Sequence, residues 1–196
     1  MFNINKLKKL IGYGKYSLVE NVEIQVRNAQ GEVKKVFQPY RWAAWIIKHF
    51  GVQLPKMPML LGFWSNSLKF SNLITNAGFA GAASRINGAD AEAAFTYLAL
   101  GIGTTAADAA DTTLESEITD SGLERASATA SRVTTTQTND TAQLVKTWTA
   151  SGSKAITEAG VLNASSSGVL LARQVFSAIN VVATDSIQLT YRIKAS

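Results

Sequence analysis

The sequence predicts a mainly β protein with a few short helices, whose C-terminal body is an antiparallel, jelly-roll-like β-sandwich. Short strand patterns follow residue 94 at a spacing of roughly ten to fifteen residues, as is typical of sandwiches. That half is rich in Ala, Thr, Ser and Gly, whereas basic and aromatic residues gather near the N-terminus. We therefore expect an N-terminal anchoring region over 1–70 with a hairpin and short helices, a connecting helix over 71–90, and the sandwich over 91–196.

The composition excludes several classes of site. The chain has 196 residues, of which 46% are hydrophobic and 17% charged, a globular composition. It has no cysteine, which excludes disulfides, thiolate metal sites and cysteine nucleophiles. A single histidine, His49, leaves little material for a His-rich metal site or a catalytic triad. No secretory signal or membrane-spanning segment is expected, and we predict no metal, cofactor or catalytic residue.

Charge divides the chain in two. The net charge of +5 combines a balance of +8 over residues 1–75, from 11 basic and 3 acidic residues, with −3 over residues 76–196. Aromatic residues follow the same division, since 11 of the 17 lie in the first 75 positions. A basic half could meet nucleic acid, a membrane surface or an acidic protein, or it could be an ordinary solvated face.

The sequence of the N-terminal region predicts two short helices and a hairpin. Residues 2–11 form a short amphipathic helix, too short to be stable without a partner. Residues 17–38 form a hairpin around the turn at 28–31, and residues 40–50 form a second amphipathic helix that ends at Gly51. His49 lies on the apolar stripe of that helix, which favours packing over ligation. The extended apolar segment 52–64 is typical of an interface.

We predict that this region contacts a partner protein through its large apolar side chains. The interface candidates are Leu7, Leu10, Trp42, Trp45, Phe50, Leu60, Leu61 and Trp64.

The second half predicts one helix followed by strands. Residues 71–87 carry a helical apolar pattern that ends at Asn87-Gly88, and small residues such as Gly78 and Gly81 would let another backbone approach closely. Strands are expected at 95–102, 126–138, 141–150, 154–162, 169–176 and 186–194, with a turn at 139–140. Residues 114–118 are expected to form a short helical or turn segment.

Two patterns near residue 100 have a chemical as well as a structural interpretation. The glycine-rich stretch at 99–106 lacks the spacing and the lysine of a phosphate-binding loop, so a turn after a strand is favoured. The acids Asp108, Asp111, Glu115, Glu117 and Asp120 cluster in sequence and could in principle hydrolyse a glycan or bind Ca²⁺. No aromatic subsite or calcium-loop motif accompanies them, so a solvated loop is favoured.

From Ser71 to the C-terminus the chain resembles a group of tailed-bacteriophage virion proteins. The resemblance is carried by S-N-L-I-T-N-A-G at 71–78, F-T-Y-L-A-L-G-I-G-T-T-A at 95–106, E-R-A at 124–126, I-T-E-A-G-V-L at 156–162, L-L-A-R-Q-V-F at 170–176 and T-D-S-I-Q-L-T-Y-R-I at 184–193. Similar modules are found as head decorations, head or tail fibres and tail-tip proteins. The resemblance therefore implies a virion protein without specifying its position in the particle.

The expected function is that of a non-enzymatic structural protein of the virion, assembled in the cytoplasm of the bacterial host. It would form a homo-oligomer and bind other virion proteins of the capsid or tail through residues 1–70. Two alternatives stay open: a receptor- or glycan-binding module of a fibre or tail tip, and a head protein that contacts DNA. We expect no membrane partner, and DNA contact is the less favoured alternative.

Overall fold

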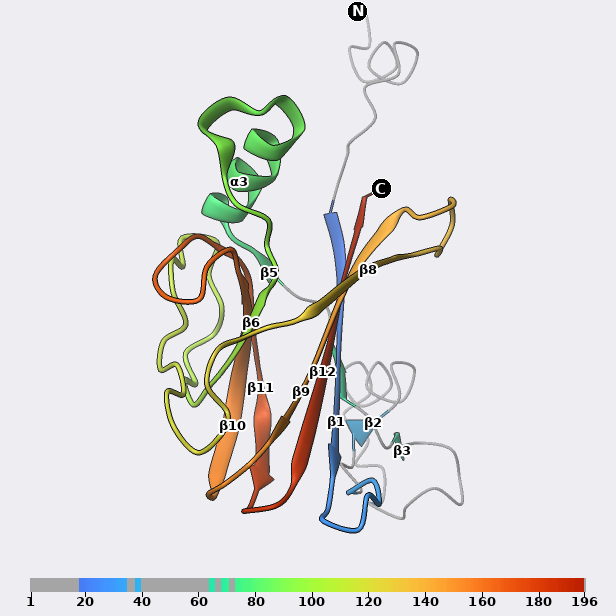
Figure 1. The fold of residues 1–196 in the computed structure, drawn as a ribbon, viewed down its shortest axis with the longest axis vertical. Coiled ribbons are helices and arrows are strands. Elements are labelled where there is room, and N and C mark those ends of the chain that lie inside the picture. The colour runs from blue at the N-terminus through green and yellow to red at the C-terminus, as the bar shows by residue number, and fades with distance from the viewer. Residues whose placement is uncertain (1–17, 35–37, 40–63, 66–67, 71–72, 196) are drawn as a thin grey trace, which may run out of the picture.

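The computed structural model describes residues 18–34, 38–39, 64–65, 68–70 and 73–195. Within these ranges the body is a β-sandwich of two antiparallel five-stranded sheets, and a short helix connects two strands of one sheet (Figure 1). The predicted antiparallel sandwich is confirmed. Its jelly-roll-like connectivity stays a prediction.

Sheet 1 has the strand order β4-β1-β12-β9-β8. Its longest pairing joins β1 to β12. Ten residues of each strand pair without interruption, from Leu18 opposite Ala195 to Arg27 opposite Ser186. The five strands are β1 (Leu18–Arg27), β4 (Leu68–Phe70), β8 (Thr129–Val133), β9 (Thr141–Thr149) and β12 (Ser186–Ala195).

Sheet 2 has the order β5-β11-β10-β6-β7. Its strands are β5 (Leu73–Ile74), β6 (Tyr97–Gly101), β7 (Ala126–Ser127), β10 (Lys154–Leu162) and β11 (Leu170–Val181). Strands β7 and β8 are separated by Ala128 alone, so the chain passes there from the edge of sheet 2 to the edge of sheet 1. A separate two-stranded ribbon pairs β2 (Gln38–Pro39) with β3 (Trp64–Ser65).

The main core lies between the two sheets. Alternating residues of β1, such as Val22 and Ile24, and of β12, such as Leu189, are fully buried against Leu98 and Ile156 of sheet 2. The apolar residues that alternate along β12, which predicted the strand, therefore lie on the face that is buried between the two sheets.

The connecting helix forms where the sequence predicted it, although it is shorter. Helix α3 (Asn76–Asn87) begins at Thr75, whose hydroxyl accepts the N–H of Gly78, and ends at Gly88 in the left-handed conformation. A Cβ on Gly78 would lie 2.1 Å from the carbonyl oxygen of Leu171, so only glycine lets the helix sit on β11. This close approach confirms the role predicted for the small residues. A 3₁₀ turn, η1 (Ala89–Ala91), follows.

Strand β1 comes from the predicted anchoring region, but it lies inside the body. The predicted turn after it forms, with Gly31 N–H donating to the Asn28 carbonyl, yet the main partners of β1 are β12 and β4. Alternation along 18–27 identified a strand but not its partner, which comes from the far end of the chain. Deleting residues 1–70 would therefore also remove two strands of sheet 1.

The rest of the predicted anchor divides into two segments. They are residues 1–17, which come before β1 in the sequence, and residues 35–63, which come after it. Of the eight interface candidates, Leu7, Leu10, Trp42, Trp45, Phe50, Leu60 and Leu61 lie outside the described residues. The backbone of Trp64 pairs with Pro39 in the β2–β3 ribbon, and its side chain is likewise outside the description.

Candidate functional site

The largest group of interacting charged side chains in the described body lies on the outer face of sheet 2, beneath the loop of residues 102–120. The loop runs over the sheet at the left of Figure 1. Leu114 packs there into a small second core with Ala99, Leu162 and Leu170. Residues 114–118, where a short helical or turn segment was expected, lie in an irregular loop with one bridge, between Glu117 and Gly101.

Glu158 of β10 is the centre of this group. Its side chain is fully buried, and its carboxylate accepts three backbone N–H groups: Gly103 at 3.0 Å, Glu115 at 3.1 Å and Ser116 at 2.7 Å. The neighbouring hydroxyl of Thr157 donates to the carbonyl of Gly103 at 2.7 Å. One strand thus holds both ends of the loop.

Arg173 of β11 neutralises that buried carboxylate. Its Nε donates to Glu158 at 2.7 Å and its Nη1 to Asp111 at 2.8 Å, while Nη2 donates to the Thr105 carbonyl and lies 3.4 Å from Glu115. The Arg173 side chain is only 2% exposed. Burial alone would lower its pKa, but the carboxylates of Asp111 and Glu158 raise the pKa above its ordinary value.

Glycines make room for the side chain of Glu158. Glu158 is paired with Gly101, and Arg173 with Gly160, across neighbouring strands. A Cβ on Gly101 would lie 2.4 Å from Glu158 Oε1 and 2.7 Å from the Ser116 carbonyl oxygen. The glycines of the stretch at 99–106 therefore accommodate a side chain of the protein itself.

The acids that the sequence singled out hold the loop in place. Burial alone would raise the pKa of Asp111, but the Asp108 N–H and the Arg173 guanidinium hold it below its ordinary value. The hydroxyl and N–H of Thr105 lower the pKa of Glu115. Asp108 accepts the N–H of Ala110, and the remaining two acids form ion pairs elsewhere on the body, Glu117 with Arg125 and Asp120 with Lys154.

The backbone N–H groups at this site could bind an anion, but the carboxylate of Glu158 already occupies them. The acids do not converge on a common space, because Arg173, Arg125 and Lys154 hold them at three different places. Among the described residues, no group of three or more His, Asp or Glu side chains is arranged to hold a metal ion. The group therefore has the character of a structural clamp, which we call the Glu158–Arg173 clamp.

The sequence analysis assigned no role to Glu158 or Arg173. The available signal was the one acid of β10 and the one base of β11, each close to large apolar residues of the same strand. Charged residues at such positions are seldom fully buried unless they are paired. The spacing of residues along the sequence could predict neither the ion pair between Glu158 and Arg173 nor the loop 102–120 that covers it.

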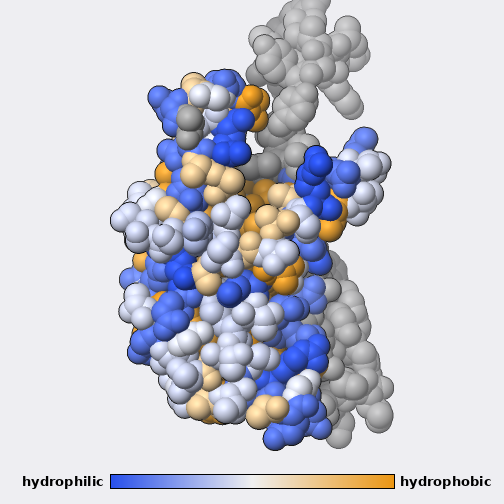
Figure 2. All heavy atoms as spheres, in the orientation of Figure 1, coloured by the Kyte–Doolittle hydropathy of each residue, from blue (hydrophilic) through white to orange (hydrophobic). Residues whose placement is uncertain are grey.

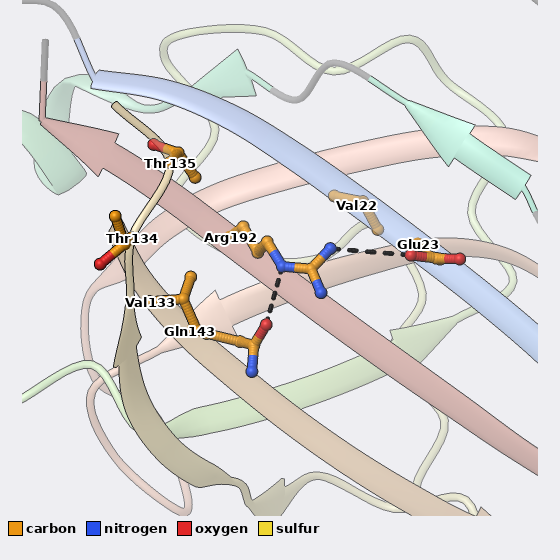
Figure 3. A pocket seen from close by; sticks show the side chains of 7 residues that line it. All are labelled: Val22, Glu23, Val133, Thr134, Thr135, Gln143 and Arg192. Carbon is orange, nitrogen blue, oxygen red and sulfur yellow. Dashed lines mark hydrogen bonds and ion pairs between the residues drawn. The ribbon is translucent and has the colours of Figure 1, made fainter. Parts of the chain in front are cut away.

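A groove of about 490 Å³ lies on sheet 1, over β12 and between β1 and the end of β8 (Figure 3). Its lining comprises Val22, Glu23, Val133, Thr134, Thr135, Gln143 and Arg192. Arg192 donates from Nε to Gln143 at 2.7 Å and lies 3.6 Å from Glu23, so its charge is already engaged. Among the lining residues that the structure describes, none is aromatic.

The end of the sandwich that carries α3 exposes apolar side chains. Phe79, Ala83 and Ile86 share one face of the helix at i, i+4 and i+7, and Phe79 and Ile86 are 50% and 89% exposed. Figure 2 shows hydrophobic side chains at the surface of this end, above a largely polar body.

The β8–β9 hairpin is closed by a second buried-carboxylate arrangement. Asp140 accepts the N–H groups of Thr135, Thr136 and Gln137, and its side chain is 7% exposed. These hydrogen bonds, that from Gln137 foremost, hold the pKa of Asp140 far below its ordinary value.

We expect Asp140 to make the stability of the protein depend on pH. Since its pKa is lower in the folded than in the unfolded state, the carboxylate stabilises the fold above about pH 4 and ceases to do so as the pH falls below that value. Asp140→Asn should therefore be less stable at pH 7 and should lose less stability between pH 4 and pH 2. Urea unfolding at several pH values measures the free energy of unfolding of both proteins. If that free energy falls as much between pH 4 and pH 2 in the variant as in the wild type, the prediction is wrong.

Comparisons with known proteins found no match: no family model, no curated protein and no solved structure is similar to this chain at a significant level. Within the described ranges, no helix has the length and apolar character needed to cross a membrane.

Proposed function

We propose that this chain is a non-enzymatic structural protein of a tailed-phage virion, assembled in the bacterial cytoplasm as a homo-oligomer. In this proposal the β-sandwich is a rigid body, and the segments 1–17 and 35–63 attach it to other proteins of the capsid or tail. The resemblance of residues 71–193 to such virion proteins supports the proposal, as does the sandwich architecture.

The observation that carries the proposal is how charge is distributed relative to the body. Residues 1–17 and 35–63 contain eight of the 19 basic residues and none of the 14 acids. The rest of the chain, β1 included, holds 11 basic and 14 acidic residues, a balance of −3. Two basic, aromatic-rich segments joined to a body of opposite charge suit binding to an acidic protein surface through an apolar centre and a charged rim.

The absence of catalysis is part of the proposal, and the engagement of the candidate acids supports it. A general acid at neutral pH needs a raised pKa, whereas hydrogen bonds and Arg173 lower the pKa of Asp111 and Glu115. These groups are held ionised in the geometry of a loop clamp.

No specific observation favours either alternative, a receptor- or glycan-binding module or a head protein that contacts DNA. Glycan sites commonly offer an aromatic face to a sugar ring, and none of the described residues that line the groove on sheet 1 is aromatic. DNA contact by the basic segments would show itself as an affinity that falls steeply with salt concentration.

The proposal is tested by comparing purified particles of the virus that encodes this chain with particles from a deletion mutant. Quantitative mass spectrometry should find the chain in wild-type particles at a fixed, multiple copy number. If the chain stays in the cell lysate and is missing from particles, the proposal is wrong.

A further inference from the structure

Helix α3 carries two of the four large hydrophobic side chains that are exposed in the described part of the chain. They are Phe79 and Ile86, and Ile86 is 89% exposed. The face of the helix that they share also includes Ala83 and has no charged residue. The two buried residues of α3, Gly78 and Gly81, face the sandwich instead. Apolar patches that a fold leaves exposed mark interaction sites.

The chain enters β1 at the end of the sandwich that carries α3. Strands β11 and β12 are joined by the turn 182–185, so the start of β11 and Ala195 of β12 lie at the same end. Leu18, the first residue of β1, pairs with Ala195. Helix α3 contacts the start of β11, because the N–H of its capping residue Thr75 donates to the Leu171 carbonyl. Figure 1 shows α3 and the start of β1 at this common end.

Strands β1 and β11 also lie on the same side of the sandwich. Strand β4 pairs with β1 at the edge of sheet 1, and β5 pairs with β11 at the edge of sheet 2. Only residues 71–72 separate β4 from β5, and α3 follows β5 directly. The sheets of a sandwich pack about 10 Å apart. A few residues of chain can therefore connect the start of β1 to α3.

The segment before β1 has the pattern and length of a partner for this face. Ile4, Leu7 and Ile11 recur at i, i+3 and i+7, which places them on one side of a helix. A helix over residues 2–11 would be about 15 Å long, against about 18 Å for the 12 residues of α3. Residues 12–17 span up to about 20 Å when extended, roughly twice the spacing of the two sheets. So short a helix is stable only when it packs on another element.

Charge favours the same pairing. Residues 1–17 contain four lysines and no acid. Arg85 is the single charged residue of α3, and residues 88–94, which follow the helix, contain Asp90 and Glu92 and no base. The helix and the residues after it thus have a balance of −1, from one basic and two acidic residues. A basic segment is attracted to this end of the molecule rather than repelled.

We propose that residues 2–11 form a helix whose apolar stripe packs on the exposed face of α3 in the same chain. The lysines of this segment lie mostly off the stripe and stay on its outer side, where a partner protein can contact them. The packing is made within one chain, so it does not rest on attachment to a virus particle. It leaves the large apolar side chains of residues 35–63, Trp42 and Trp45 among them, for the proposed attachment.

A disulfide between the two helices tests this packing in the full-length protein, which has no cysteine of its own. Leu7 and Ala83 are the central residues of the two apolar faces, so Leu7→Cys/Ala83→Cys should form an intrachain disulfide under mild oxidation. Lys9→Cys/Ala83→Cys is the control, because Lys9 lies off the stripe, and it should cross-link at least about tenfold more slowly. Equal rates in the two variants, or a disulfide-linked dimer as the main product, would overturn the proposal.

Hydrogen exchange tests the same packing without a covalent bond. Ile86→Lys places a charge in the apolar face and should leave the fold intact, because the Ile86 side chain is 89% exposed. Amide exchange over residues 4–11, measured by mass spectrometry, should be at least about tenfold faster in this variant than in the wild type, since an undocked helix of this length is mostly unfolded.

The control for the exchange experiment is Val182→Lys, which changes an exposed apolar residue in the turn at the opposite end of the sandwich. Its exchange over residues 4–11 should equal that of the wild type, and unchanged melting temperatures check that both variants fold. The same exchange rate over residues 4–11 in all three proteins would overturn the proposal.

Packing on α3 and attachment to particles can fail separately. A chain whose residues 4–11 are protected and cross-link to α3, but which is absent from particles, would retain this inference and overturn the proposed function. A particle-bound chain whose residues 4–11 exchange freely would do the reverse.

Discussion

Replacing Glu158 with alanine is expected to lower the free energy of unfolding by about 3–5 kcal/mol, the largest loss among single substitutions in the Glu158–Arg173 clamp. The side chain is fully buried and accepts three backbone N–H groups as well as Arg173. Its removal leaves a buried guanidinium with a weaker set of partners and leaves loop N–H groups unsatisfied. For a chain of this length the melting temperature should fall on the order of 10 °C.

The control for this prediction is Glu124→Ala, which removes an exposed acid and should change stability by less than about 0.5 kcal/mol. A double-mutant cycle with Arg173→Ala should reveal a coupling of about 2 kcal/mol or more, since the two groups share one network. Chemical denaturation with a two-state fit measures both quantities. A loss for Glu158→Ala no larger than that for Glu124→Ala would mean that the clamp does not stabilise the loop.

Replacing both Trp42 and Trp45 with alanine is expected to lower incorporation into particles by at least about tenfold. Buried aromatic side chains dominate protein interfaces, whereas charges at the rim contribute little. Replacing Lys8 and Lys9 with alanine should therefore reduce incorporation by less than about threefold. The amount of chain per particle, measured on purified virions, decides between these outcomes.

The choice of the lysine control follows from the structure. Lys34 also lies in the basic part of the sequence, but it forms an ion pair with Asp185, whose side chain is 3% exposed. Burial alone would raise the pKa of Asp185, but the hydrogen bonds from Lys34 and the Val182 N–H hold it below its ordinary value. Changing Lys34 would therefore disturb the body itself. Equal losses for the tryptophan and lysine pairs, with unchanged melting temperatures, would refute the anchoring role of the tryptophans.

Local patterns predicted the elements of the body well. Strand β10 has the predicted bounds, β12 extends the prediction by one residue, and α3 ends at Asn87-Gly88 as expected. These elements carry their signals locally: alternation where one face is buried, a capping glycine, and small residues where two backbones approach.

Non-local pairing could not be predicted in the same way. Strand β1 shows alternation, but nothing within 18–27 indicates that it pairs with β12 rather than with the next strand pattern along the chain. The same holds for Glu158 and Arg173, whose roles arise only when loop 102–120 folds over sheet 2. The acids of that loop were visible as a cluster, yet Arg173 and Lys154, which pair with three of them, lie in distant segments.

We propose that the slightly acidic sandwich is attached to a virus particle by the basic segments on either side of β1, residues 1–17 and 35–63. A reconstruction of the intact particle by electron cryomicroscopy tests it most directly. We predict density for the sandwich at repeated positions on the capsid or tail, with residues 1–17 or 35–63 in contact with a neighbouring protein. A particle in which no density fits the sandwich, or in which those segments face only solvent, would contradict it.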